Sequence, residues 1–269
     1  MSWETGLAGF AVGLAIALVT TPVGVSGAVF LLPVQLSVLH VPSPAVTPTN
    51  LLFNVGATPG ALLRHARQGT LLSPLARRLV LGTLPGVVVG AVLRVFVVPG
   101  AQVFRLVVAA VLLPLGLWLV VTTLSARHRP QDASGVGRPS PDDVSRGTTL
   151  LALAVGVVGG IYGIGGGSIL GPVLVGRGLP TRAVAPAALC STFVTSVVGS
   201  LTYAGIALTT EGGDIAPEWA LGLCCGLGGV VGGYIGALLQ PRAPERLLRL
   251  MLGALAVALA ALYAVQAVA

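Results

Sequence analysis

The sequence predicts an all-α, polytopic helical membrane protein with two inverted repeats, each made of one glycine-broken re-entrant or discontinuous segment and three transmembrane helices. Three observations support this fold class. First, 55% of the 269 residues are hydrophobic and only 9% are charged, whereas a soluble domain carries about 25% charged residues. Second, apolar runs of about 20 residues, long enough to cross a bilayer, recur along the chain. Third, glycine and proline interrupt two of these runs at corresponding places.

A single long polar stretch divides the chain into two halves. Residues 125–147 are rich in Pro, Gly, Ser and mixed charge, which is typical of a solvated linker. Residues 1–124 therefore form a first repeat half, and residues 148–269 form a second. Within these halves we predict two broken segments, 7–39 and 149–176, and six spans, 46–63, 76–97, 102–124, 183–208, 218–240 and 246–268.

The two halves resemble each other in sequence. The broken segments contain TPVGVSGAVFLLPVQL (21–36) and GGIYGIGGGSILGPVL (159–174), and the spans that follow contain AVTPTNLLFN (45–54) and AVAPAALCST (183–192). Glycines and a proline recur in the same order, which indicates an internal duplication. If each broken segment is re-entrant, each half makes an odd number of crossings, so the two halves insert in opposite orientations.

The arginines indicate how the broken segments lie in the membrane. All 15 basic residues are arginine, and cytoplasmic loops normally carry the excess of positive charge. If both broken segments are re-entrant, 13 of the 15 arginines fall on the side of the linker and only Arg94 and Arg105 on the other. If both segments cross the membrane, the division is nearly even. We therefore predict a multi-pass protein of the cytoplasmic membrane, with the linker in the cytoplasm and both termini outside.

The interruptions predict a binding site for a small anion. At a break, the free N–H groups of a helix N-terminus and the helix dipole favour negative charge. Glycine lets the backbone approach a ligand and adopt positive φ, which we expect at Gly27 and Gly166. Uncharged amides and hydroxyls would complete a site from which the anion can leave again. The predicted substrate-binding residues are Gly24, Ser26, Gly27, Asn50, Asn54, Gly163, Gly165, Gly166, Gly167, Ser168 and Thr192.

Other classes of function find little support in the sequence. The arginines lie between apolar runs with few aromatic residues nearby, so nucleic acid is not an expected partner. The cysteines Cys190, Cys224 and Cys225 lie in apolar segments without metal-ligand or C-x-x-C spacing, so neither a metal nor a cofactor is expected. Ser26 lies in a G-x-S-G sequence like that of rhomboid proteases. No histidine is placed to act as its base, so we predict no catalytic residue and no enzyme.

The glycine-rich motifs resemble those of the sulfite exporter TauE/SafE family of bacterial membrane proteins. The resemblance rests on GIGGGSILGPVL (163–174) and its weaker copy GVSGAVFLLP (24–33), and it covers essentially the whole chain. It implies transport of sulfite or organosulfur, sulfonate-type anions. An inside-negative potential favours outward movement of an anion. A passive anion channel and a non-transporting membrane scaffold are the alternatives. The oligomeric state stays open, with a homodimer as one option.

Overall fold

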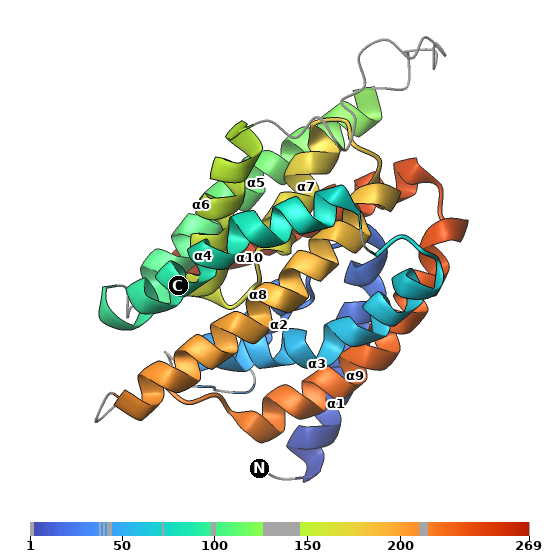
Figure 1. Ribbon diagram of the computed structural model, residues 1–269. Coiled ribbons are helices and arrows are strands. Elements are labelled where there is room, and N and C mark those ends of the chain that lie inside the picture. Colours follow the sequence, from blue (N-terminus) through green and yellow to red (C-terminus); the bar gives the residue numbers. More distant parts are fainter. Residues whose placement is uncertain are drawn as a thin grey trace.

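The computed structural model describes residues 3–37, 39, 41, 45–71, 73–97, 101–125, 146–209 and 215–268, and these parts contain helices and no strand (Figure 1). The first half contains α1 (Trp3–Thr20), the 3-10 helix η1 (Thr21–Val23), α2 (Ala28–Ser37), α3 (Val46–Arg67), α4 (Pro74–Phe96) and α5 (Ala101–Ser125). The second half contains α6 (Arg146–Tyr162), α7 (Gly167–Gly176), α8 (Thr181–Thr209), α9 (Trp219–Leu239), the 3-10 helix η3 (Gln240–Arg242) and α10 (Glu245–Val268).

Each predicted broken segment is a long helix, an interruption and a short helix. Residues 24–27 follow η1 and separate it from α2, and residues 163–166 separate α6 from α7. In Figure 1, α7 runs back from its break toward the end of the bundle at which α6 begins. The six predicted spans correspond to α3, α4, α5, α8, α9 and α10. The predicted linker 125–147 lies outside the described residues, apart from its ends, which belong to α5 and α6.

Length and composition identify a polytopic membrane protein. Five of the described helices are long and apolar enough to cross a membrane, namely α1 with η1, α4, α8, α9 with η3, and α10. The 22-residue α3 is less apolar because it carries Thr47, Asn50, Asn54 and Thr58. Large apolar side chains such as Leu201 lie on the outside of the bundle, where they suit contact with lipid. The predicted all-α, polytopic fold class is therefore confirmed.

The long helices of one half pack on long helices of the other. α1 and α3 pack along α9, α6 and α8 pack along α4, α5 packs on α10, and α3 packs on α8. The two short helices are enclosed by this arrangement, since Leu31 and Leu32 of α2 and Leu170 and Val175 of α7 are 0% exposed. The fold thus holds two short helices, and the breaks from which they start, inside a shell of longer ones.

Glycines permit close contacts between these helices, for example that between α4 and α6. A Cβ atom added at Gly86 would clash with the carbonyl oxygen of Leu153, and one at Gly90 would clash with that of Val157. Between apolar helices in lipid, association depends on close van der Waals packing, which small residues allow. The spacing of four residues on both helices keeps the small residues on one contact face.

We expect Gly86→Ala to destabilise the protein, because the added methyl group pushes α4 away from α6. Overpacking of this kind costs about 1–3 kcal/mol in the free energy of unfolding. The matched control is Gly205→Ala in α8, where an added Cβ meets nothing within 4 Å. This control should stabilise the helix by up to about 1 kcal/mol. Thermal unfolding in detergent measures both, and equal midpoints for the two variants would contradict the packing described here.

Candidate functional site

The first break is a turn that only glycine fits. Gly24 follows η1 with φ of 74°, and its N–H donates to the carbonyl oxygen of Thr21. An added Cβ atom would also collide with Ala185 of α8. Positive φ is costly for residues with a side chain, so both the backbone conformation and the contact with α8 require glycine. The turn leads directly into Ser26, which is 3% exposed.

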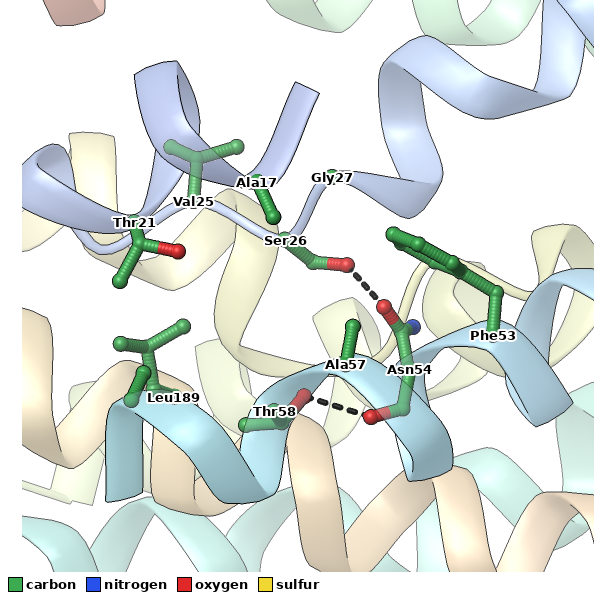
Figure 2. Close-up of a pocket in the computed structure, with 11 residues that line it drawn as sticks. Ala17, Thr21, Val25, Ser26, Gly27, Phe53, Asn54, Ala57, Thr58 and Leu189 are labelled. Carbon is green, nitrogen blue, oxygen red and sulfur yellow. Dashed lines mark hydrogen bonds between the residues drawn. The ribbon is translucent and has the colours of Figure 1, made fainter. Parts of the chain in front are cut away.

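Asn54 of α3 links this break to the second one. The Ser26 hydroxyl donates to Oδ1 of Asn54, and Nδ2 of Asn54 donates to the carbonyl oxygen of Gly163 at 3.5 Å. Oγ of Ser26 also accepts the N–H of Ala28, the first residue of α2, at 3.1 Å. Figure 2 shows the side chains of Ser26 and Asn54 pointing toward each other. One carboxamide, itself 1% exposed, therefore bonds to both interruptions.

The second break contains two glycines in the left-handed region. Gly163 has φ of 68° and Gly165 has φ of 72°. A side chain at Gly163 would clash with the carbonyl oxygen of Thr47 on α3, and a Cβ atom at Gly165 would lie 2.7 Å from Cγ2 of Thr192 on α8. These contacts place the second break between α3 and α8.

The expectation of positive φ at Gly27 and Gly166 is wrong. Gly166 has φ of −65°, and Gly27 is not among the glycines with positive φ. Both positions instead require glycine for space. An added Cβ atom would lie 2.8 Å from Cγ2 of Ile16 at Gly27, and 2.7 Å from Cβ of Thr83 at Gly166. The turn itself is formed earlier in each motif, where the chain leaves the preceding helix.

Polar side chains from three helices surround the second break. Oγ1 of Thr195 accepts the N–H of Gly166 at 3.1 Å, and the hydroxyls of Thr83 and Ser191 lie 2.9 Å apart. The Ser168 hydroxyl donates to the carbonyl oxygen of Ile164 at 2.5 Å, so it ties the first turn of α7 to the break before it. These side chains hold the backbone of the break in place.

Some buried polar atoms near the breaks have no hydrogen-bond partner in the described part of the chain. Asn50 donates through Nδ2 to the carbonyl oxygen of Ala28 at 2.8 Å, but its Oδ1 has no partner. The same is true of Oγ1 of Thr192 and Oγ of Ser196. All three residues are 0% exposed. Buried polar atoms are nearly always hydrogen-bonded, so these atoms are available to a ligand or to water.

A small cavity adjoins the first break. Its volume is about 10 Å³, comparable to the space that one water molecule needs. Figure 2 shows the hydroxyl of Thr58 donating to the carbonyl oxygen of Asn54 at the edge of this cavity. The lining residues come from α1, η1, the break, α3 and α8, and they are Ala17, Thr21, Val25, Ser26, Gly27, Phe53, Asn54, Ala57, Thr58, Ala61 and Leu189.

The predicted site residues lie together in the structure. Gly24, Ser26 and Gly27 form the first break, Gly163, Gly165 and Gly166 form the second, and Gly167 and Ser168 start α7. Asn50 and Asn54 contact the breaks from α3, and Thr192 contacts the second break from α8. Thr83 of α4 was missed. The signal for it was a hydroxyl in an otherwise apolar span, three residues before the Gly86 contact with α6.

Arg94 lies near the end of the predicted span 76–97, and the structure places it in the last turn of α4, where it is only 1% exposed. Its Nε donates to Oγ1 of Thr47 at 3.3 Å, and that hydroxyl donates to the carbonyl oxygen of Ile161 at 3.3 Å. Ile161 is in the last turn of α6. A buried positive charge therefore lies one side chain away from the helix that leads into the second break.

The arrangement offers two helix N-termini and uncharged polar groups to a ligand. α2 begins directly after Gly27 and α7 begins directly after Gly166, so both N-termini face the breaks that Asn54 connects. Within the described residues, no three side chains of His, Cys, Asp or Glu come together as metal ligands.

Comparisons with known proteins identify the family to which the chain belongs. The chain matches the family described as sulfite exporter TauE/SafE over residues 9–263. It is 26% identical over 261 residues to a probable membrane transporter protein of Xylella fastidiosa (strain 9a5c), covering 95% of this chain and 90% of that protein. No solved structure matches the chain. The chain therefore belongs to the sulfite exporter TauE/SafE family, whose members are membrane transporters and not enzymes.

Proposed function

We propose that this transporter moves small oxyanions, of the sulfite or sulfonate type, outward across the cytoplasmic membrane. The observation that carries the proposal is the convergence of two buried helix N-termini on breaks joined by Asn54. Free N–H groups at a helix N-terminus, with the helix dipole behind them, bind anions. The eleven residues predicted from the sequence are proposed to form the binding site.

The chemistry of the surrounding groups supports an anion. None of the predicted site residues is charged, which suits a ligand that must be released. One buried charge in this region is the guanidinium of Arg94, which reaches the end of α6 through Thr47. Charged side chains inside a membrane are costly and commonly mark an ion pathway. Sulfur chemistry itself is supported by the family description alone.

We infer that residues 1–124 and 148–269 are inverted repeats joined by a cytoplasmic linker, 125–147. The contacts between helices support this. In the two halves, α1, α3 and α4 correspond to α6, α8 and α9. The contacts of α1 and α3 with α9 therefore correspond to the contacts of α6 and α8 with α4, and all four are present. The breaks follow the same exchange. Gly24 contacts Ala185 of α8 and Gly163 contacts Thr47 of α3, and these residues occupy matching places in the aligned sequences AVAPAALCST and AVTPTNLLFN.

The close helix contacts also exchange between the halves. Gly86 of α4 faces the carbonyl oxygen of Leu153 on α6, and Gly232 of α9 faces that of Leu14 on α1. In the aligned motifs, Leu14 lies ten residues before Gly24 and Leu153 lies ten residues before Gly163. Paired broken helices in inverted repeats are a common design of transport sites near the midplane of the membrane.

This topology predicts that both termini lie outside the cell and that the linker lies in the cytoplasm. The reason is the distribution of arginine, since 13 of 15 fall on the linker side. Fusions of a reporter that is active on one side of the membrane, placed after Ala269 and after Ser134, measure the orientation. Opposite signals at the two sites agree with the proposal. A cytoplasmic C-terminus would contradict the inverted arrangement.

Purified protein in liposomes should carry sulfite or a small sulfonate, and an inside-negative potential should speed efflux. The potential contributes about 2.3 kcal/mol per charge per 100 mV to outward movement. Flux of a panel of anions, measured with and without an imposed potential, tests this. Saturation and countertransport distinguish a carrier from a passive channel, and the absence of any flux would favour a scaffold. Movement of cations or neutral solutes alone would refute the proposal.

Asn54→Ala should lower this flux by about tenfold or more, because it removes a hydrogen-bonding group that joins both breaks and leaves the Ser26 hydroxyl without an acceptor for its proton. Thr58→Val is the matched control on the same helix. It removes only a bond from the Thr58 hydroxyl to the carbonyl oxygen of Asn54, so it should retain most of the flux. The amount of folded protein in the membrane is measured for both.

A further inference from the structure

One side of α8 carries three buried hydroxyl oxygens with no hydrogen-bond partner in the described part of the chain. They belong to Thr192, Ser196 and Ser200. Thr192 and Ser196 are 0% exposed. Residues four apart lie one above the other on a helix, so the three hydroxyls form a row, which we call the α8 hydroxyl row.

Other hydroxyls on the same helix are satisfied. Thr195 donates to the carbonyl oxygen of Ser191 at 2.7 Å, and Thr202 donates to that of Val198 at 2.8 Å. Ser and Thr hydroxyls within a helix usually donate to the carbonyl oxygen four residues earlier. The three hydroxyls of the α8 hydroxyl row make no such hydrogen bond. Leaving a buried hydroxyl unpaired costs free energy, so the row is better explained by a ligand or water than by packing.

The row starts at the second break and runs along the inside of the bundle. Oγ1 of Thr192 would lie 2.6 Å from a Cβ atom at Gly167, the first residue of α7. Ser196 and Ser200 lie about 6 and 12 Å farther along α8, at about 1.5 Å per residue. Gly199, between them, packs against Leu51 of α3. This side of α8 is therefore turned toward the other helices.

The far end of the row approaches the buried charge of α4. Tyr203, the next large side chain on this side of α8, donates its hydroxyl to the carbonyl oxygen of Gly160 at 2.9 Å. Tyr203 and Ala91 of α4 belong to the same buried apolar cluster. Arg94 lies three residues beyond Ala91, about one helical turn. A series of hydroxyl groups thus extends from the second break toward the guanidinium of Arg94. Hydroxyl donors that end at a positive charge suit an anion and not a cation.

We propose that the α8 hydroxyl row lines the outward part of the pathway, where its hydroxyls replace the hydration shell of an oxyanion between the break and Arg94. This inference rests on the proposed function, because it assigns the path by which the same anion leaves the site. Neutral donors spaced about 6 Å apart allow the ion to pass from one hydroxyl to the next without being trapped.

Two readouts on Ser196→Ala test the row. Sulfite flux in liposomes should fall by about tenfold, the factor expected when a hydrogen bond to a charged group is lost. The midpoint of thermal unfolding should stay unchanged or rise, because an unpaired buried hydroxyl is removed. Thr202→Val, which removes a satisfied hydroxyl from the same helix, should keep its flux. Unchanged flux in Ser196→Ala would overturn the proposal.

Cysteine accessibility tests the path without relying on transport. In a background with Cys190, Cys224 and Cys225 replaced by Ala, Ser196→Cys and Ser200→Cys should react with a membrane-impermeant, anionic methanethiosulfonate reagent. Leu201→Cys is the control, since Leu201 is 67% exposed on the outside of the bundle and its thiol would face lipid. Absence of labelling at both serine positions would overturn the path even if sulfite flux is observed.

Protection by ligand separates the path from its substrate. An excess of ethanesulfonate, which does not react with thiols, should slow the labelling of Ser196→Cys and leave the labelling of an exposed loop cysteine unchanged. Labelling that ethanesulfonate does not slow would support the path and count against a sulfonate-type substrate.

Discussion

The carboxamide of Asn54 is the interaction on which the site depends. It accepts the hydroxyl of Ser26 from the first break and donates to the carbonyl oxygen of Gly163 in the second. Inside a membrane, no bulk water can satisfy the backbone groups that a broken helix leaves open, so such breaks persist only where protein groups or a wet cavity receive them. A single side chain from α3 performs this for both halves, and so sets the position of one helix N-terminus relative to the other.

The close packing of the long helices makes this arrangement possible. Glycines on α4 and α9 let these helices approach the backbones of α6 and α1 so closely that an added Cβ atom would clash with carbonyl oxygens. The short helices α2 and α7 then occupy the interior that the long helices enclose. On α8, the hydroxyl of Thr195 donates to the carbonyl oxygen of Ser191, whereas Oγ1 of Thr192 has no hydrogen-bond partner in the described part of the chain.

Much of this arrangement could be predicted from the sequence, because its causes are local. Hydropathy identifies the spans, and the glycine-rich interruptions identify the breaks between α1 and α2 and between α6 and α7. Asn54 and Thr192 could be selected as polar residues at matching places in the two apolar halves, and Ser26 as a polar residue within the first break. The hydrogen-bond partners of these residues could not be predicted from the sequence, because they depend on how α3 and α8 pack against the breaks.

Two further features could not be predicted for the same reason. Arg94 lies near the end of the predicted span 76–97, but its burial against Thr47 depends on the contact of α4 with neighbouring helices. Positive φ was expected at Gly27 and Gly166, whereas the turn occurs at Gly24, Gly163 and Gly165. Sequence identifies a glycine-rich turn but does not distinguish a glycine needed for its φ from one needed for space, since that depends on side chains such as Thr83 and Ile16.

The most direct measurement is the position of a bound oxyanion. Selenite has the shape and charge of sulfite and carries an anomalous scatterer, so diffraction from crystals grown with selenite locates the ion without ambiguity. We expect an anomalous peak between the two breaks, within hydrogen-bond distance of Ser26 or Asn54 and of the N-terminus of α7. A peak confined to the loop arginines, with none between the breaks at saturating selenite, would contradict it.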